Sequence, residues 1–197
     1  MYHIPNDKRA IHSAQKLCES FNKLMREKRL NEITVSELQR NSRISRATIY
    51  RLFDMPTDIL LYQMTKIFED ASQTVAEKNI TNLDEMLLEL LKIWTSHKEI
   101  WQVAYDNQRC DLIFSTHNEF INRQKADLIQ KAGIDEIQIV YLTSFISATF
   151  TSLLLSWLRT GAIDTPEEIH RRMKENLRCL LELEKIDISK IDPPQAE

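Results

Sequence analysis

The sequence predicts an all-α protein of about nine helices, and three observations support this class. Only two of the 197 residues are glycine, although the tight turns of a β-rich protein favour glycine at positive φ. Leu, Ile, Glu and Lys, which suit helical geometry, are abundant. Apolar residues recur at spacings of three and four, which is the period of one helix face. The chain is also long enough to bury a sizeable core.

The first three helices are expected within the first 53 residues. Residues 7–28 carry one apolar stripe, which predicts an amphipathic helix. Thr34 and Glu37 form a capping box that opens a short helix of about seven residues. Ser45 is a preferred N-cap residue, and it predicts a second short helix over 46–52.

The remaining helices are placed by the same start and stop signals. Pro56 suits a first helical turn and opens a long helix that reaches about residue 77. Gly133 is expected just after the end of a helix, and Thr165 and Glu168 form another capping box. The helices expected after residue 80 are 82–95, 96–107, 111–133, 136–159 and 166–184. The tail, 189–197, is expected to be flexible.

Charge is distributed unevenly along the chain. The net charge is −3, yet residues 1–62 hold 11 Lys and Arg against 7 Asp and Glu. A basic first third on an acidic remainder suggests that the first third meets a polyanion, although this imbalance alone does not decide the point.

Cysteine usage and the N-terminal sequence indicate a cytoplasmic protein. The three cysteines, Cys18, Cys110 and Cys179, are far apart and odd in number, which argues against a disulfide framework or a zinc site. The N-terminus lacks the apolar core of a signal peptide. No cofactor or metal is expected, because the five histidines show no metal-ligand spacing.

Residues 138–158 contain no charged side chain, which invites comparison with a membrane span. The segment carries seven Ser and Thr residues, whereas a lipid-spanning helix is more uniformly apolar. We therefore expect a helix buried on most sides within a soluble protein that has no membrane partner.

The two short helices expected after Thr34 and Ser45 give the main indication of function. Helices of this length are marginal in water alone, so a small shared core must hold them against the first helix. Two such helices with a tight turn between them form a helix-turn-helix, whose second helix enters the DNA major groove. The core residues expected are Val35, Leu38, Ile44, Ile49, Leu52 and Phe53.

The polar residues of this unit suit DNA contact. Arg can bind guanine in the major groove, and Ala or a Thr methyl group can contact thymine. Hydroxyl groups and free backbone N–H groups at helix starts can donate to phosphates. The alternative is that these residues are ordinary exposed side chains. The candidates for DNA contact are Thr34, Ser36, Ser45, Arg46, Ala47, Thr48, Tyr50 and Arg51.

Residues 33–53, ITVSELQRNSRISRATIYRLF, resemble the DNA-binding domain of the tetracycline-repressor (TetR) family. The family pattern is roughly T-V-x-x-I-A-x-x-A-G-V-S-x-G-T-L-Y-x-H-F. The matching positions are Thr34, Val35, Leu38, Ile44, Ser45, Thr48, Ile49, Tyr50 and Phe53. The resemblance implies a DNA-binding domain over 1–54 and a helical ligand-binding and dimerisation domain over 55–188.

Four positions depart from the family pattern. Arg43 replaces the usual turn glycine, so the turn must accommodate a bulkier residue. Gln39 stands where a small Ala usually packs, and Ala47 stands where Gly is common. Pro56 occupies the place of a Lys that usually supports phosphate binding, so that contact is not carried over to this chain.

The resemblance also implies a homodimer that binds a palindromic DNA operator as a repressor. Family members pair their last two long helices into a four-helix bundle, and many release DNA when a small apolar or aromatic effector enters the body. The interface residues expected here are Phe150, Leu154, Trp157, Met173, Leu177 and Leu180. The candidates for lining an effector cavity are Trp94, Trp101, Tyr105, Phe114, His117 and Phe120. An ordinary packed core remains the alternative for these six residues.

The sequence bears on three alternative functions. The sequence has no Gly-rich phosphate loop, no H-E-x-x-H and no recognisable Ser/His/Asp set, which argues against an enzyme. A transcriptional activator or co-regulator controlled by a protein partner keeps the same fold. A helical binding module without a DNA role is disfavoured by the outward polar residues of 46–51.

Overall fold

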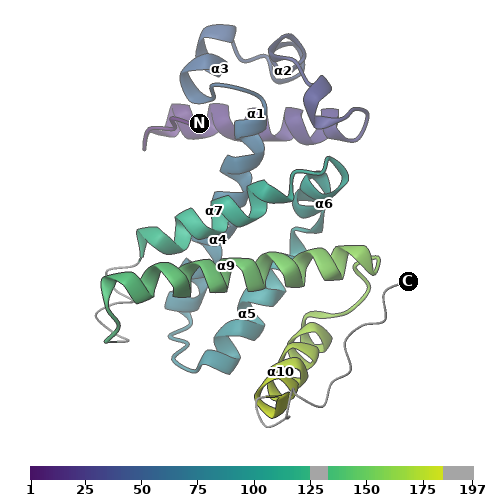
Figure 1. Cartoon of the computed structure of the whole chain (residues 1–197). Helices are drawn as coiled ribbons and strands as arrows, with labels where there is room; N and C mark the ends of the chain where they lie inside the picture. Colours follow the sequence, from purple (N-terminus) through teal and green to yellow (C-terminus); the bar gives the residue numbers. More distant parts are fainter. Residues whose placement is uncertain (125–132, 184–197) are drawn as a thin grey trace.

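The protein is described by a computed structural model over residues 1–124 and 133–183. These residues form nine α-helices and one 3-10 helix, which confirms the all-α class (Figure 1). The elements are α1 Lys8–Met25, η1 Leu30–Glu32, α2 Val35–Ser42, α3 Arg46–Leu52, α4 Thr57–Glu77, α5 Leu83–Ser96, α6 Lys98–Asp106, α7 Cys110–Arg123, α9 Glu136–Arg159 and α10 Pro166–Leu183.

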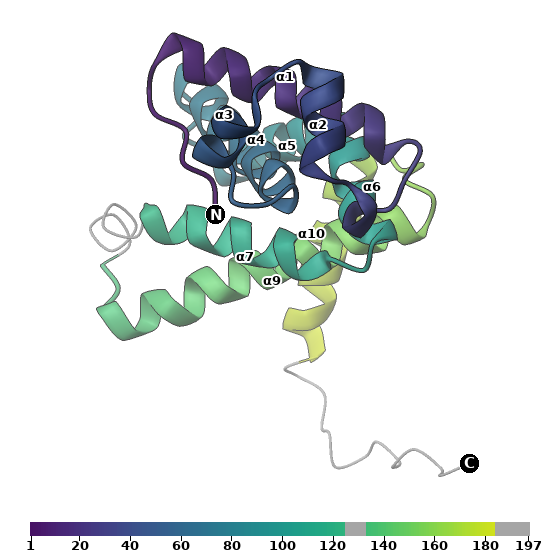
Figure 2. The same ribbon diagram turned by 90° about the horizontal axis from the view of Figure 1, so that it is seen from above.

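The helices form two groups joined by α4. Helices α1 to α3, together called the helix-turn-helix unit (residues 8–53), lie at one end of the molecule (Figure 1). Helix α4 packs on α1 at one end and on α5, α6 and α7 further along. Helices α4 to α10 form the body, in which α7 packs along α9 and α10 packs on α5. Figure 2 shows the same arrangement from above.

Helix starts agree closely with the expected capping residues. Asp7, Thr34, Ser45, Asn82 and Asp135 each accept a backbone N–H at the start of the helix that follows. These bonds satisfy donors that a helix start otherwise leaves unpaired. The capping signals in the sequence therefore fixed most starts to within one or two residues.

Several helix ends differ from the expectation. Helix α1 ends at Met25 rather than near residue 28, and η1 was not foreseen. Pro56 is the residue before α4 rather than its first residue, and α6 begins at Lys98 after His97 instead of being capped by Ser96. Of the helix expected over 111–133, the described part ends at Arg123, and 125–132 lie outside the described residues.

The helix-turn-helix unit has a small core of its own. Leu17 and Phe21 of α1 are fully buried, as are Leu38 of α2 and Leu52 of α3. Ile49 is almost fully buried beside them. Large apolar side chains buried on one face of each short helix supply the stabilisation that the helices lack alone.

Aromatic rings fill the centre of the body. Phe68 of α4 lies 5.7 Å from Trp101 of α6 and 5.5 Å from Phe150 of α9, measured between ring centroids. Trp94 of α5 lies 4.2 Å from Phe150. This cluster ties four helices of the body together, because edge-to-face aromatic pairs add to the stabilisation from burial.

Helix α9 is the one described helix long and apolar enough to cross a membrane, with a mean hydropathy of 1.6 over its most apolar window. The core helix of a soluble protein meets the same criterion. The buried face of α9 carries Thr143, Ser147 and Thr151 against the body. This single helix therefore does not indicate a membrane protein.

Candidate nucleic-acid interface

The start of α2 is fixed by a network around Glu37. The Thr34 hydroxyl accepts from the Glu37 backbone N–H at 3.3 Å, and the Glu37 carboxylate accepts from the Thr34 backbone N–H at 3.1 Å. Lys28 also forms an ion pair with Glu37. The Lys28 ammonium and the hydrogen bonds from Thr34 lower the pKa of the Glu37 carboxyl to about 2. The network ties the end of α1 to the start of α2.

The turn between α2 and α3 is built by Ser42 and Arg43. The Ser42 hydroxyl donates to the Leu38 carbonyl at 2.6 Å and accepts from the Ile44 N–H at 3.1 Å. Arg43 adopts a left-handed conformation with φ of 60°, and its N–H donates to the Gln39 carbonyl at 2.9 Å. Arg43 therefore performs the role that the resemblance assigns to glycine, and it does so in a conformation that disfavours a Cβ atom.

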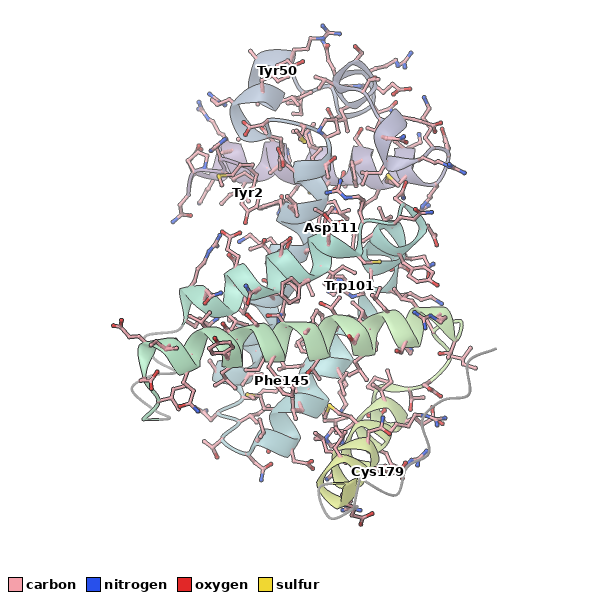
Figure 3. All side chains as sticks on the ribbon, in the orientation of Figure 1. Tyr2, Tyr50, Trp101, Asp111, Phe145 and Cys179 are labelled. Atoms are coloured by element: carbon pink, nitrogen blue, oxygen red, sulfur yellow. The ribbon has the colours of Figure 1, made fainter. Side chains whose placement is uncertain are left out.

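Helix α3 presents one apolar face and one polar face. Ile49 and Leu52 point into the core, whereas Tyr50 is 55% exposed. Arg46, Ala47 and Arg51 are also exposed, and Tyr50 lies at the outer end of the molecule (Figure 3). The Ser45 hydroxyl caps the helix by accepting from the Thr48 N–H at 3.2 Å. The inward and outward residues of α3 are those that the sequence predicted, except that Thr48 is half-buried rather than exposed.

A hydrogen-bond network joins the exposed faces of α2 and α3. The Arg46 guanidinium donates to the Gln39 side-chain carbonyl at 3.1 Å and to the Ser36 hydroxyl. The structure thus brings together two of the predicted contact residues, Ser36 and Arg46. It adds Gln39, which the sequence analysis noted only as a departure from the family pattern. The contact between Gln39 and Arg46 could not be predicted, because the two residues are seven positions apart on different helices.

The N-terminal segment supports the end of α3. The His3 N–H donates to the Leu52 carbonyl at 2.8 Å, and the Asp54 N–H donates to the Met1 carbonyl at 3.1 Å. The Tyr2 ring packs edge-on against Tyr62 with centroids 5.4 Å apart. No pattern in the sequence indicates this contact, because it joins residues about 50 positions apart without periodicity.

The residues predicted to line an effector cavity lie in a packed core. Trp94, Trp101 and His117 are buried together with Phe150. His117 stacks on Phe150 with centroids 4.5 Å apart, and its Nδ1 lies 3.0 Å from the Ser147 hydroxyl. Burial lowers the pKa of His117 to about 4, so the ring is neutral near pH 7.

The six predicted residues do not enclose a common cavity in the described residues. Of the six, only Trp94 lines the small cavity beside Phe150, which measures about 10 Å³ and holds about one water molecule. Tyr105 and Phe120 are half-buried against the core, and Phe114 is half-buried outside it. A role for the six residues in binding an effector stays a prediction.

The predicted dimer residues fall into two sets. Phe150, Leu154 and Trp157 are buried within the protomer, so the prediction that they face a partner is wrong. Their face of α9 packs on α6 and α7, and the Phe150 ring contacts Trp94 of α5. Leu177 and Leu180 of α10 are exposed and Met173 is half-buried, as an interface requires.

Metal-ligating side chains do not gather at any point of residues 1–124 or 133–183. No group of three or more His, Cys, Asp or Glu side chains there is arranged to hold a metal ion.

Comparison with known proteins connects the body of the chain to transcriptional regulators. A TetR-type family model described as a transcriptional regulator C-terminal region matches residues 81–178, which extend from before α5 into α10. No curated protein sequence matches the chain at a significant level.

Solved structures share the fold at low sequence identity. The chain resembles Lin0861 from Listeria innocua with a TM-score of 0.77 and 16% identity, covering 90% of this chain and 96% of that one. A TetR transcriptional regulator from Streptococcus agalactiae matches with a TM-score of 0.54 and 16% identity, over 82% of this chain and 91% of that one. The dihydroxyacetone kinase operon activator DhaS matches with a TM-score of 0.52 and 16% identity, over 88% and 98%.

The helix-turn-helix motif, the all-helical body and the matching family model agree with one another. The TetR family consists of transcriptional regulators and is not a family of enzymes. This chain belongs to the TetR family of transcriptional regulators.

Proposed function

We propose that this chain is a sequence-specific DNA-binding regulator that acts as a dimer in the cytoplasm and has no catalytic activity. The observation that carries the proposal is the outward face of α3. Arg46, Tyr50 and Arg51 project from a helix whose opposite side is locked into a core, at the end of the molecule farthest from α10 (Figure 1). A rigid, exposed, basic helix of this kind fits the DNA major groove.

Each polar residue of this surface has a distinct chemistry toward DNA. Arg46 and Arg51 carry guanidinium groups that can bind guanine O6 and N7 in pairs. Ala47 and the Thr48 methyl group suit contact with a thymine methyl. Thr34, Ser36, Ser45 and Tyr50 carry hydroxyl groups that suit phosphate oxygens. To reach a base, the Arg46 side chain exchanges its bonds to Gln39 and Ser36 for bonds to DNA.

The proposed dimer surface is the outer face of α9 together with α10. Ile137, Val140, Tyr141 and Phe145 are 58–73% exposed on one side of α9. Figure 3 shows Phe145 on this helix, well away from the labelled Trp101 of the body core. The same side continues with exposed Ala148 and Ser152, whose small side chains allow close approach of a second helix. A stripe this apolar on a soluble protein fits a second copy of the chain.

Two modes of control are compatible with this arrangement. We propose a repressor released from a palindromic operator by a small effector, as the family resemblance implies. The alternative is an activator or co-regulator controlled by a protein partner. The burial of Trp94, Trp101 and His117 favours the alternative, because an effector could reach these side chains only after rearrangement of the core. The fold shared with DhaS, which is described as an operon activator, is also compatible with it.

The test is selection of binding sites from a random duplex DNA library, followed by titration of the winning sequence at two salt concentrations. We expect a palindromic winner whose affinity falls steeply with salt, because Arg contacts displace counterions from phosphates. The matched control is Arg46→Ala, which removes the guanidinium but leaves the core of α3 intact. Failure of the wild type to enrich any sequence would overturn the proposal.

A further inference from the structure

A groove separates the helix-turn-helix unit from the body. One wall consists of residues 29–31 of the helix-turn-helix unit together with Thr57 at the start of α4, and the other is the turn between α6 and α7, residues 106–109. The groove encloses about 380 Å³, which is within the range of small-molecule sites. It is far larger than the space in the aromatic core.

Most of the residues that line this groove have polar side chains. Leu30 is the only apolar residue among those that line it, and its side chain is buried. Asn31, Thr57 and Gln108 contribute an amide, a hydroxyl and a second amide. A ligand with several oxygen atoms fits these groups, whereas an apolar effector would leave them without hydrogen-bond partners.

Two guanidinium groups lie on opposite walls of the groove. Within residues 1–124 and 133–183, Arg29 forms no ion pair. Arg109 donates from Nε and Nη2 to the Asp111 carboxylate, at 3.0 Å each. A guanidinium has five N–H donors, so three remain on Arg109. The ion pair therefore fixes the orientation of the Arg109 guanidinium and leaves three of its N–H donors available to a ligand.

One carboxylate, that of Asp106, lines the groove together with the two arginines. Asp106 accepts from the Gln102 side-chain amide at 2.8 Å, but this neutral donor does not offset the charge of the carboxylate. Asp111, which is paired with Arg109, is not among the lining residues. Two arginines against one aspartate give the residues that line the groove a net formal charge of +1, which favours an anion over a cation or a neutral molecule.

Asn107 joins the two walls. Its side-chain carbonyl accepts from the Leu30 N–H at 2.8 Å, and its amide donates to the Val103 carbonyl at 2.8 Å. Leu30 lies in η1, two residues after Lys28, which is paired with the start of α2. A molecule that bridges the walls would therefore contact both the body and the segment leading into α2.

We propose that this groove binds a small hydrophilic organic anion, with its phosphate or carboxylate group held between Arg29 and Arg109. By bridging the two walls, the anion favours one placement of the helix-turn-helix unit relative to the body. The anion site depends on no assumption about DNA, whereas its effect on regulation rests on the proposed function.

The test is calorimetric titration of the full-length protein, without DNA and at constant ionic strength. The probes are glycerol 3-phosphate and citrate, with glycerol as the uncharged control. We expect saturable binding of at least one anion with a Kd of about 1 mM or tighter, and none of glycerol. Binding of glycerol 3-phosphate alone identifies phosphate as the recognised group, and binding of citrate alone identifies carboxylate.

Variants locate the site. Arg29→Gln and Arg109→Gln should each weaken the affinity about tenfold or more, because each removes charged hydrogen-bond donors. The matched control is Arg123→Gln, an exposed arginine paired with Glu119 at the other end of α7. Failure of both anions to saturate, or equal affinity in all three variants and the wild type, would overturn the proposal. Circular dichroism checks that each variant remains folded.

A second measurement separates this inference from the proposed function. If the anion acts on regulation, a saturating amount should change the affinity for the selected DNA about fivefold or more, and Arg29→Gln should abolish the change. An unchanged DNA affinity would contradict the regulatory effect and leave the anion site standing. If the protein binds an anion saturably but selects no DNA sequence, the proposed function is refuted and the anion site is not.

Discussion

Arg43 shows how a single residue departs from its family pattern at a conformational cost. Its φ of 60° lies in the left-handed region, where a Cβ atom approaches the following carbonyl oxygen. We expect Arg43→Gly to raise the free energy of unfolding by about 1 kcal/mol, measured by urea denaturation. Arg43→Ala keeps the Cβ atom and removes the charge, so it is the matched control. Equal stabilisation by both substitutions would show that charge, not backbone strain, is responsible.

His117 makes the stability of the body depend on pH. Burial lowers its pKa from 6.5 to about 4, so between these values the unfolded chain binds a proton that the folded chain does not. The contribution of His117 to the free energy of unfolding therefore falls as the pH is lowered from about 6.5 to about 4, by up to about 3 kcal/mol.

His117→Gln tests this dependence, because glutamine can keep a hydrogen bond to Ser147 and does not titrate. The pH profile of the variant should be flatter than that of the wild type between pH 6.5 and 4, when both are measured by urea denaturation. Glu37, whose pKa is lowered to about 2, loses its stabilising effect only below about pH 4.5, so the two groups act in largely separate ranges. Parallel profiles for wild type and variant would contradict the assignment to His117.

At the scale of elements, α3 divides its residues between the core and the proposed DNA-binding face. Arg46→Ala and Tyr50→Ala remove exposed groups and should each weaken binding to the selected DNA about tenfold, with little change in the free energy of unfolding. The measurement is fluorescence anisotropy of labelled DNA. Arg171→Ala is the control, since Arg171 is an exposed arginine of α10 paired with Glu175. Unchanged affinity for both α3 variants would rule out α3 as the reading helix.

Local chemistry explains which elements could be predicted from the sequence. The starts of α2, α3, α5 and α10 are specified by residues within one turn of the helix, so short-range signals suffice. Helix ends are specified less strictly. Arg26 closes α1 by hydrogen bonds to the carbonyls of Lys23 and Leu24, without a glycine or proline to mark the end. The 3-10 helix η1 is similarly unmarked.

At the scale of the whole molecule, contacts between distant residues limit what a sequence predicts. The polar face of α3 followed from helical periodicity, but its bonds to Ser36 and Gln39 depend on how two helices cross. Residues 138–158 were expected to be buried on most sides, and this is wrong for the protomer, where 33% of the most apolar window of α9 is buried. The inner face of α9 could not be predicted, because none of these positions is charged and the periodicity cannot distinguish the inner face from the outer one.

The two faces of α9 provide the sharpest test of the proposed dimer. Phe145 is 66% exposed and Phe150 is 5% exposed, although the two rings are only five residues apart in one helix. If a second copy covers the outer face, Phe145→Asp buries a charge in the dimer but not in the protomer. We expect this variant to sediment as a monomer at micromolar concentration. Its helicity should stay close to that of the wild type, because Phe145 contributes little to the core of the protomer.

Phe150→Asp is the matched comparison, because it places the same charge inside the aromatic cluster of the body. An unpaired buried carboxylate is strongly destabilising, so this variant should lose helical structure rather than merely dissociate. The wild type should sediment as a dimer under the same conditions. A monomeric wild type, or a Phe145→Asp variant that stays dimeric, would exclude the outer face of α9 as the dimer surface. Loss of the dimer should also weaken binding to a palindromic DNA site, since each half-site would then be bound independently.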